Sequence, residues 1–437
     1  MKPYAAAIRA AELIARLGHV QQYTGLVLES HGPDAALGEL CEVYPPGRIR
    51  PVMAETMGFR DGKVLLMPHS DLQGIRPGSE VVATGRTLHV GVGPGLLGRI
   101  IDAHGLPLDD RPAVTPEQHR SLFAAATNPV QRGRIKTLFE TGIKCIDVLT
   151  PVGVGQRLGI FAGSGVGKSV LLGMLAQNSK ADVNVIALIG ERGREVREFV
   201  EENLGAALER SIVVVSSAER SALERIHAAF TATAVAEYFR DAGRSVALMF
   251  DSLTRFAMAR REIGLAMGEP PTSRGYTPSV FGLLPQLVER AGPGHAGRGS
   301  ITAFYTVLVE GDDLNDPVAD SARSILDGHL VLSRDVANRG RYPALDILKS
   351  LSRLSTHLAS PHDLEMAREV SAVEAEYAES KDLVALGAYK PGTNPRLDYV
   401  FRVRPKLEQF LSQSPTSVAA RNDALAQLKA ILEEKSQ

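Results

Sequence analysis

Residues 158–171 read Leu-Gly-Ile-Phe-Ala-Gly-Ser-Gly-Val-Gly-Lys-Ser-Val-Leu and decide the fold class of this 437-residue chain. The apolar run that ends at Phe161 is typical of a buried strand, and the run after Ser169 opens like a helix. Glycines between the two runs let backbone N–H groups converge on phosphate oxygens, and the helix N-terminus adds a favourable dipole. The stretch therefore predicts a phosphate-binding P-loop (Walker A motif) between a strand and a helix.

Two side chains of this loop carry the expected chemistry. Lys168 is expected to reach the β- and γ-phosphates of a nucleotide, and the Ser169 hydroxyl to ligate Mg²⁺. The strict pattern has glycine where this chain has Ala162, and a small residue is expected to suffice there. The alternative is an ordinary glycine-rich turn. The residues expected to contact the nucleotide are Gly163, Ser164, Gly165, Val166, Gly167, Lys168, Ser169 and Val170.

Length and composition restrict the class of protein. A chain of 437 residues is too long for one core, so two or three domains are expected. Because the net charge is −1, no basic field favours a nucleic-acid partner. Cys41 and Cys145 match no disulfide or metal pattern, which favours a reducing cytosol. No apolar run approaches the roughly 18 residues that a membrane span needs.

The first 18 residues predict a separate amphipathic helix. Apolar residues recur at helical spacing over residues 4–17, with charged residues beside them, and Gly18 is the expected C-terminal stop. These charges also argue against a signal peptide. The helix can pack on its own domain or dock on a partner protein, and the sequence leaves both alternatives open.

Residues 19–92 predict a small antiparallel β-barrel. Short strand candidates recur there at regular spacing, one of them over residues 23–30, and Asp61-Gly62 is typical of a hairpin turn. Aromatic and basic residues are sparse in this part. A structural or ring-forming role is therefore favoured over the binding of single-stranded nucleic acid.

Residues 93–360 predict a parallel sheet covered by helices on both faces. The segment 91–112 is rich in glycine, proline and aspartate and reads as a domain junction. Apolar strand-like runs then alternate with helical stretches, one of them over residues 194–208. Ligands of such sheets bind at the carboxyl ends of the strands, where the P-loop lies. Residues 361–437 are expected to be mostly helical, with a break at Lys390–Pro395.

Two carboxylates follow predicted strands. Asp251 closes an apolar strand, as the Walker B acid does, and is expected to orient Mg²⁺; the alternative is a cap for the next helix. Glu191 could polarise the water that attacks the γ-phosphate, although a glutamate at a strand end usually faces solvent. Arg192 could contact phosphate or merely pair with Glu195.

Several stretches together are closely similar to the flagellar type III export ATPases, which are related to the subunits of rotary ATP synthases. The similarity runs from about residue 20 to 410 and is densest over 155–355. The stretches that carry it are Gly163–Ser169, Ile189–Phe199, Asp251–Ile263, Gly268–Pro271, Glu310–Asp313 and Ala319–Arg334.

This resemblance implies a Mg²⁺-dependent ATPase that assists flagellar protein export as a homohexamer. Glu191 matches the family's catalytic carboxylate, Tyr342 the aromatic residue that stacks on adenine, and Arg353 the arginine that reaches into a neighbouring subunit's site. The expected catalytic residues are then Glu191, Lys168, Arg192 and Arg353, with ATP and Mg²⁺ as ligands. The fold implied is an α/β RecA-like P-loop core with an N-terminal β-barrel and a C-terminal helical domain.

The resemblance also implies a location and partners. The chain is expected in the cytoplasm, peripheral to the export apparatus, with a stator-like regulatory protein at the N-terminal helix, a central stalk-like protein, the export gate and chaperone–substrate complexes. Ala319–Arg323 favours the flagellar branch over the virulence injectisome branch, and the tail after Ser412 departs from better-known members. The rival hypotheses are a nucleic-acid translocase, a non-catalytic nucleotide-binding subunit and an ATP synthase subunit.

Overall fold

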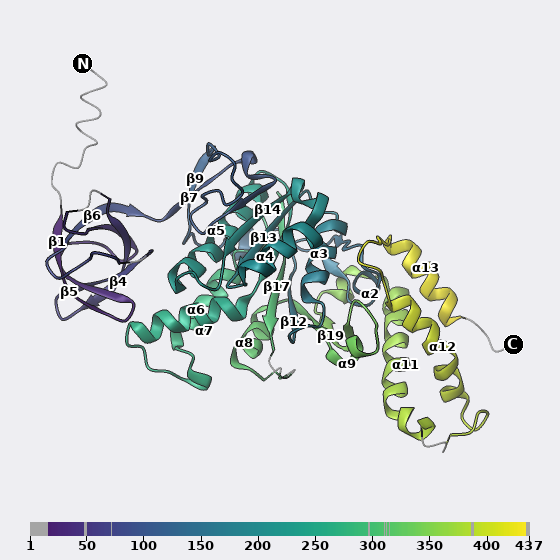
Figure 1. The fold of residues 1–437 in the computed structure, drawn as a ribbon. Coiled ribbons are helices and arrows are strands. Elements are labelled where there is room, and N and C mark those ends of the chain that lie inside the picture. Colours follow the sequence, from purple (N-terminus) through teal and green to yellow (C-terminus); the bar gives the residue numbers. More distant parts are fainter. Residues whose placement is uncertain are drawn as a thin grey trace.

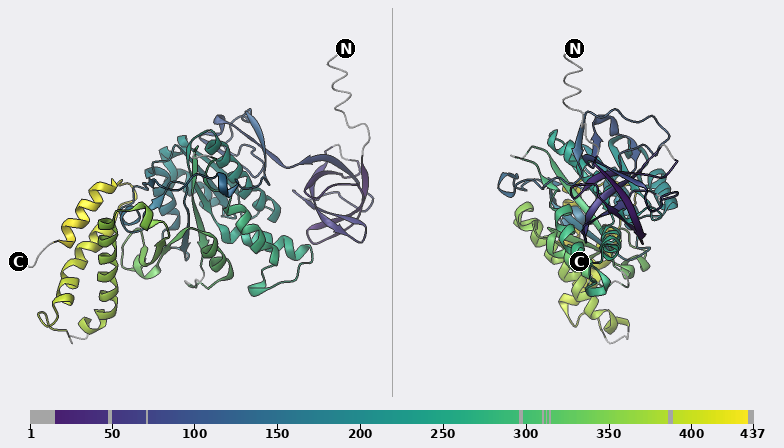
Figure 2. Two further views of the ribbon diagram at one scale, coloured as in Figure 1. Left: turned by 180° about the vertical axis from the view of Figure 1, so that it is seen from behind. Right: turned by 90° about the vertical axis from the view of Figure 1, so that its left-hand side faces the viewer.

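Three parts lie in a row in the computed structural model (Figure 1): a β-barrel, a central α/β domain and a helical domain. The structure describes residues 16–47, 50–70, 72–295, 298–309, 311, 313, 315–385 and 389–433. Views from behind and from one end agree that the barrel and the helical domain occupy opposite ends (Figure 2). The predicted fold class, an α/β core between a barrel and a helical domain, is confirmed.

The barrel is closed and its strands pair antiparallel in the order β1-β2-β5-β4-β3-β6. The predicted hairpin at Asp61-Gly62 is confirmed: both residues have positive φ, and Arg60 pairs with Lys63 across the turn. The single strand predicted over residues 23–30 is wrong, because Gly25 turns the chain there with a φ of 61°. The strands are β1 (Leu17–Thr24), β2 (Val27–His31), β3 (Glu39–Tyr44), β4 (Val52–Arg60), β5 (Lys63–Pro68) and β6 (Glu80–Thr87).

The predicted N-terminal helix lies almost entirely outside the described residues. Its last residue, Leu17, and its expected stop, Gly18, instead begin strand β1, so that part of the prediction is wrong. A Cβ atom on Gly18 would lie 2.1 Å from the carbonyl carbon of Gly32. Glycine is therefore required at position 18 by the close approach of two backbones, not by the end of a helix.

The central sheet runs in the order β19-β18-β12-β17-β15-β13-β14-β8, and the short β16 pairs beside β17. Pairs from β18 to β8 are parallel, whereas β19 and β16 are antiparallel to their neighbours. Its strands are β8 (Arg99–Ile101), β12 (Arg157–Ala162), β13 (Val183–Ile189), β14 (Ser211–Ser216), β15 (Ser245–Asp251), β16 (Gly292–Pro293), β17 (Ser300–Leu308), β18 (Gly328–Leu332) and β19 (Leu345–Ser352).

Both faces of this sheet are covered, because its middle strands are apolar throughout. In β13, Val185 and Ala187 belong to a core shared with α5, whereas Ile186 and Leu188 belong to a core shared with α3. The helices of this domain are α2 (Lys144–Leu149), α3 (Lys168–Asn178), α4 (Gly193–Glu198), α5 (Ala222–Asp241), α6 (Leu253–Ala266), α7 (Pro278–Val288), α8 (Pro317–Ile325), α9 (Arg334–Asn338) and α10 (Ser355–Leu358).

The helix predicted over residues 194–208 is broken. After α4 the chain forms a π-helical segment, Phe199–Leu204, and then a 3-10 segment, Gly205–Arg210. The π segment lies tightly against α3, since a Cβ atom on Gly173 would lie 2.7 Å from the carbonyl oxygen of Asn203. Packing against α3 therefore overrides the regular helical pattern of the sequence.

Short elements complete the α/β domain and its link to the barrel. The segment predicted as a junction contains β8, which joins the central sheet. The remaining elements are the paired strands β7 (His89–Val92) and β9 (Gln118–Ser121), the paired strands β10 (Leu138–Phe139) and β11 (Val152–Gly153), and the 3-10 turns Pro94–Leu96, Pro129–Gln131 and Ser273–Gly275.

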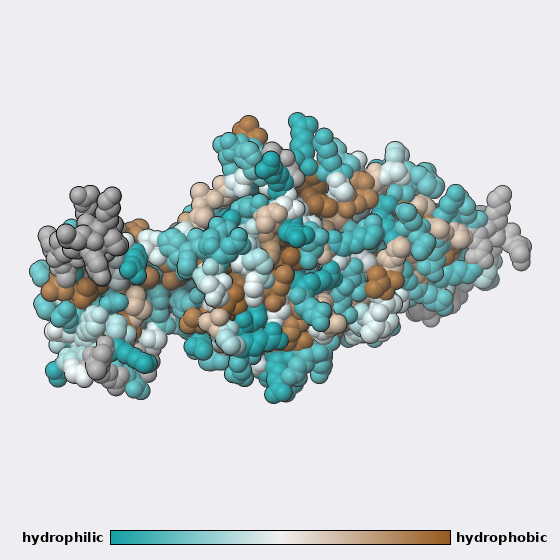
Figure 3. Space-filling view, turned by 90° about the horizontal axis from the view of Figure 1, so that it is seen from above, coloured by the Kyte–Doolittle hydropathy of each residue, from teal (hydrophilic) through white to brown (hydrophobic). Residues whose placement is uncertain are grey.

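The helical domain consists of α11 (Pro361–Ala385), α12 (Pro395–Leu411) and α13 (Arg421–Leu432). The predicted break at Lys390–Pro395 is confirmed, and the Asn394 side chain caps α12 by accepting hydrogen bonds from the N–H groups of Arg396 (3.0 Å) and Leu397 (3.3 Å). No single helix in the described residues is long and apolar enough to cross a bilayer. From above, the surface is mainly hydrophilic, and hydrophobic residues show in small groups (Figure 3).

Candidate nucleotide site

The P-loop joins β12 to α3 at the carboxyl edge of the central sheet. Gly165 and Gly167 have φ values of 78° and 91°, a region that only glycine adopts readily. Ala162, in contrast, is the last residue of β12, is fully buried and accepts a hydrogen bond from the N–H of Val309 (3.1 Å). The departure from the strict motif is therefore tolerated, because position 162 does not have a left-handed backbone.

Lys168 meets two carboxylates from neighbouring strands. Its Nζ lies 3.4 Å from Glu191 Oε1, after β13, and forms an ion pair with Asp251 at the end of β15. Burial opposes the charge of Lys168, but the two carboxylates outweigh burial and raise its pKa. Thr306 of β17 donates a hydrogen bond to Asp251 Oδ1 (2.7 Å). Four adjacent segments of the sheet edge thus bring one cation and two anions together.

Glu191 is buried, with 8% of its surface exposed, so the expectation that a strand-end glutamate faces solvent does not apply. Burial raises its pKa, Lys168 and Arg255 partly offset this effect, and a hydrogen bond with the Glu195 side chain adds to the rise. A carboxylate with a raised pKa, held beside a P-loop, can accept a proton from water.

Arg255 is a site residue that the sequence reasoning missed. It lies in α6, one helical turn after Asp251, and a Cβ atom on Gly190 would lie 3.0 Å from its Cβ. Its Nε is buried and has no hydrogen-bond partner among the described residues. The available signal was its place in the first turn of the helix that follows this strand, because the first turn starts at the strand end.

Tyr342 lies beside the P-loop, although 174 residues separate it from Lys168 (342 − 168). A Cβ atom on Gly167 would lie 3.6 Å from two ring carbons of Tyr342, and the ring is 45% exposed. The backbone N–H of Gln413 donates to the Tyr342 carbonyl oxygen (2.8 Å). The segment that follows α12 therefore helps to hold an accessible aromatic ring next to the loop.

Two predicted residues are not brought into this group. Arg192 has a side chain that is 79% exposed and pairs with Glu195 at 3.6 Å, which is the second of the two alternatives given for it above. Arg353 follows β19, is exposed, and donates to the carbonyl oxygen of Arg323 (2.9 Å). Among the residues that the structure describes, neither side chain forms a hydrogen bond or an ion pair with Lys168 or Glu191 of the same chain.

The oxygen donors near the loop fit Mg²⁺. Asp251 offers a buried carboxylate and Ser169 an exposed hydroxyl on the first turn of α3, and such hard oxygen ligands suit this ion. The cap of α6 is Ser252, whose hydroxyl accepts from the N–H of Arg255 (3.2 Å). Asp251 therefore does not serve as that helix cap, and its carboxylate faces Lys168.

Comparison with known proteins places this geometry in a family. The ATP synthase alpha/beta family, nucleotide-binding domain, matches residues 142–352, and the beta-barrel domain of the same family matches residues 20–85. The T3SS EscN ATPase C-terminal domain matches residues 359–430. The flagellum-specific ATP synthase of Bacillus subtilis (strain 168) is 50% identical over 418 residues, which cover 95% of each chain. The chain belongs to the type III export ATPases.

Solved structures agree with this assignment. The export ATPase superposes on the assembled ATPase EscN of the enteropathogenic E. coli type III secretion system with a TM-score of 0.90 and 41% identity, covering 95% of this chain and all of that one. EscN in complex with its central stalk EscO gives a TM-score of 0.87 and 40% identity over the same shares. The predicted export ATPase function is confirmed, and the flagellar branch is favoured by the higher identity to the flagellar relative.

Proposed function

We propose that this export ATPase hydrolyses ATP with Mg²⁺ in a homohexameric ring at the cytoplasmic face of the flagellar export apparatus. The observation that carries the proposal is the convergence of Lys168, Glu191 and Asp251 at the carboxyl edge of the sheet. A non-catalytic nucleotide-binding subunit has no need of a buried glutamate beside the phosphate loop.

The residues divide the chemistry among them. The backbone N–H groups of Gly163–Val170 bind the phosphates, and Lys168 neutralises their charge. Ser169 and Asp251 hold Mg²⁺, which when bound would neutralise phosphate charge. Glu191 orients the attacking water and accepts its proton, while Arg255 keeps the surrounding charge in balance. Tyr342 stacks on the adenine, and Arg192 assists from the rim of the site.

Arg353 acts on a neighbouring subunit in this proposal. Its side chain is exposed and, among the described residues, forms no hydrogen bond with the P-loop of its own chain. A guanidinium supplied across an interface stabilises the charge that spreads over the transferring phosphoryl group. The assembled state of the similar EscN supports a ring, in which every interface would carry one site.

The partners are proposed from the same family. EscN has been solved with a central stalk, and we infer a stalk-like partner here. A stator-like regulator on residues 1–18, the export gate and chaperone–substrate complexes complete the proposed set, and nucleic acid is not among them. The division into residues 19–92, 93–360 and 361–437 stays a prediction. The injectisome is the alternative system, and the likeness to EscN supports it.

Lys168→Ala tests the proposed hydrolysis. Among the described residues, Lys168 is the only cation that forms ion pairs with both Glu191 and Asp251. Because the variant removes this cation, we expect phosphate release to fall by roughly 10²-fold or more. Steady-state phosphate release with ATP and Mg²⁺ measures it. The matched control is Lys180→Ala, which changes an exposed lysine two residues after the end of α3. Turnover that survives in Lys168→Ala would show that this loop is not the site.

Tyr342→Ala is expected to weaken ATP binding selectively. Loss of one stacked aromatic ring is expected to raise KM for ATP about tenfold and to leave kcat nearly unchanged. Tyr342→Phe keeps the ring and should behave like the wild type, because ring carbons of Tyr342 lie next to Gly167. An unchanged KM in Tyr342→Ala would remove the adenine role.

A further inference from the structure

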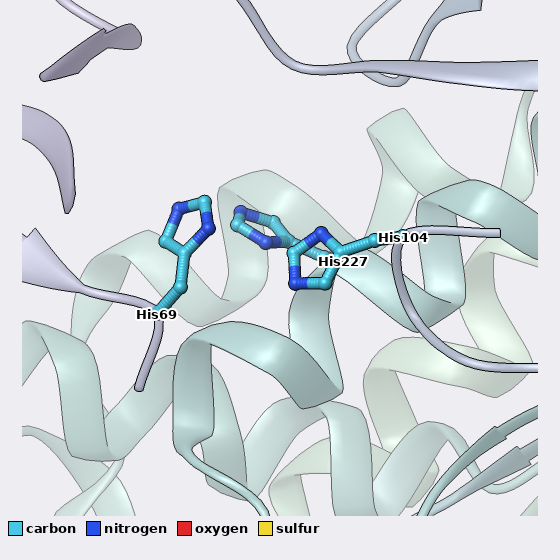
Figure 4. Close-up of side chains that lie close together, drawn as sticks. All are labelled: His69, His104 and His227. Carbon is cyan, nitrogen blue, oxygen red and sulfur yellow. The ribbon is translucent and has the colours of Figure 1, made fainter. Parts of the chain in front are cut away.

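Three histidines far apart in the sequence meet between the barrel and the α/β domain (Figure 4). His69 follows β5 of the barrel, His104 follows β8, and His227 lies in α5. One ligand nitrogen of each lies within 4.8 Å of the others. The nucleotide site uses none of them.

These rings are held in place but incompletely satisfied. His227 has no exposed surface and His69 only 9%, whereas His104 is half-buried. His227 Nε2 lies 2.8 Å from Glu55 Oε2, so this nitrogen donates to the carboxylate and Nδ1 keeps its lone pair. His227 Nδ1 and His69 Nε2 are buried and have no hydrogen-bond partner among the described residues. A buried nitrogen without a partner costs free energy unless something binds it.

We propose that His69, His104 and His227 bind a divalent transition-metal ion, most suitably Zn²⁺. Three imidazoles with one open position form a donor set that Zn²⁺ accepts. Glu55 acts as the carboxylate that orients His227, an arrangement found behind many metal-bound histidines.

A cleft beside the cluster agrees with metal binding. The cleft has a volume of about 490 Å³, lies between the barrel and the start of α5, and is lined by His69, so it reaches one of the three rings.

The geometry requires a small adjustment. The rings of His69 and His104 stack, with centroids 5.2 Å apart and planes at 11°. Nitrogens around tetrahedral Zn²⁺ lie about 3.4 Å apart, whereas those of the cluster lie up to 4.8 Å apart, so side-chain rotation must draw them together by up to about 1.4 Å. Because Glu55 and His69 belong to the barrel and His227 to α5, the bound ion would fix the barrel against the α/β domain. The alternative is three neutral packed imidazoles with a water between them.

The test is titration of the tag-free full-length chain with Co²⁺ and Zn²⁺ in excess Mg²⁺, which occupies oxygen-donor sites. We expect one Co²⁺ per chain with the visible absorption of tetrahedral nitrogen coordination, displaced by Zn²⁺. Zn²⁺ should also raise the thermal midpoint of the wild type, because it binds only the folded chain.

His104→Gln is the decisive variant, since its half-buried side chain can be changed with little risk to folding. We expect its Zn²⁺ affinity to fall at least tenfold and the thermal shift to disappear, with a similar loss of affinity in Glu55→Gln. His119→Gln, an exposed histidine in β9, is the matched control and should bind like the wild type. A wild type without the Co²⁺ spectrum, or a His104→Gln variant with unchanged affinity, would overturn the site and leave the packed-imidazole alternative.

Discussion

Glu191→Gln is expected to lower kcat for ATP hydrolysis by roughly 10²- to 10⁴-fold while the affinity for ATP stays close to that of the wild type. The amide keeps the size of the side chain but cannot accept the proton of the attacking water. Lys168 remains held by Asp251, so the phosphate-binding part of the site should survive. Single-turnover phosphate release and binding of a fluorescent nucleotide separate the two effects.

Glu201→Gln is the matched control for this change. Glu201 lies ten residues further on, is exposed and pairs with Arg197 on the surface (2.8 Å), so its loss should change turnover little. If Glu191→Gln kept more than about a tenth of wild-type turnover, the buried carboxylate would not be the general base.

Arg353→Ala is expected to reduce turnover by roughly 10³- to 10⁵-fold, as the loss of an arginine finger does in other phosphoryl-transfer enzymes. The fold should tolerate the change, because the side chain is exposed and its recorded hydrogen bond goes to one backbone carbonyl, that of Arg323. ATP binding should change much less than turnover, since the charge that Arg353 stabilises develops in the transition state.

Two further variants make this prediction specific. Arg353→Lys keeps the charge but loses the planar fork of donors, so we expect it to remain strongly impaired. Arg334→Ala removes another exposed arginine, at the start of α9, and should leave turnover unchanged. Equal activity of Arg353→Ala and the wild type would remove the finger from the mechanism.

The parts of the fold that could be predicted depend on local patterns. The P-loop, the hairpin at Asp61-Gly62 and the strand that ends at Asp251 are each set by a short run of residues, and the structure has all three. The role of Gly18 is not visible in the sequence, because the backbone that approaches it, Gly32–Pro33, lies elsewhere in the chain. The broken helix after residue 193 is not visible either, because packing against α3 decides its form.

The site residues also divide into those that a local sequence pattern predicts and those that depend on contacts distant in the sequence. Lys168, Glu191 and Asp251 stand at strand ends, so a parallel sheet brings them together and the sequence could foresee it. Arg255 needed the additional step of following α6 for one turn. The histidine cluster joins segments up to 158 residues apart (227 − 69), and no spacing rule could indicate that contact.

Mixing two inactive variants tests most directly whether the active site is completed between subunits. Arg353→Ala chains keep an intact P-loop, and Lys168→Ala chains keep an intact arginine. When the two are assembled together in equal amounts, about a quarter of the sites should combine both intact parts, so ATP hydrolysis should return to about a quarter of the wild-type rate. Activity no higher than the mean of the two variants assembled alone would contradict the account, because Arg353 would then act within its own chain or not at all.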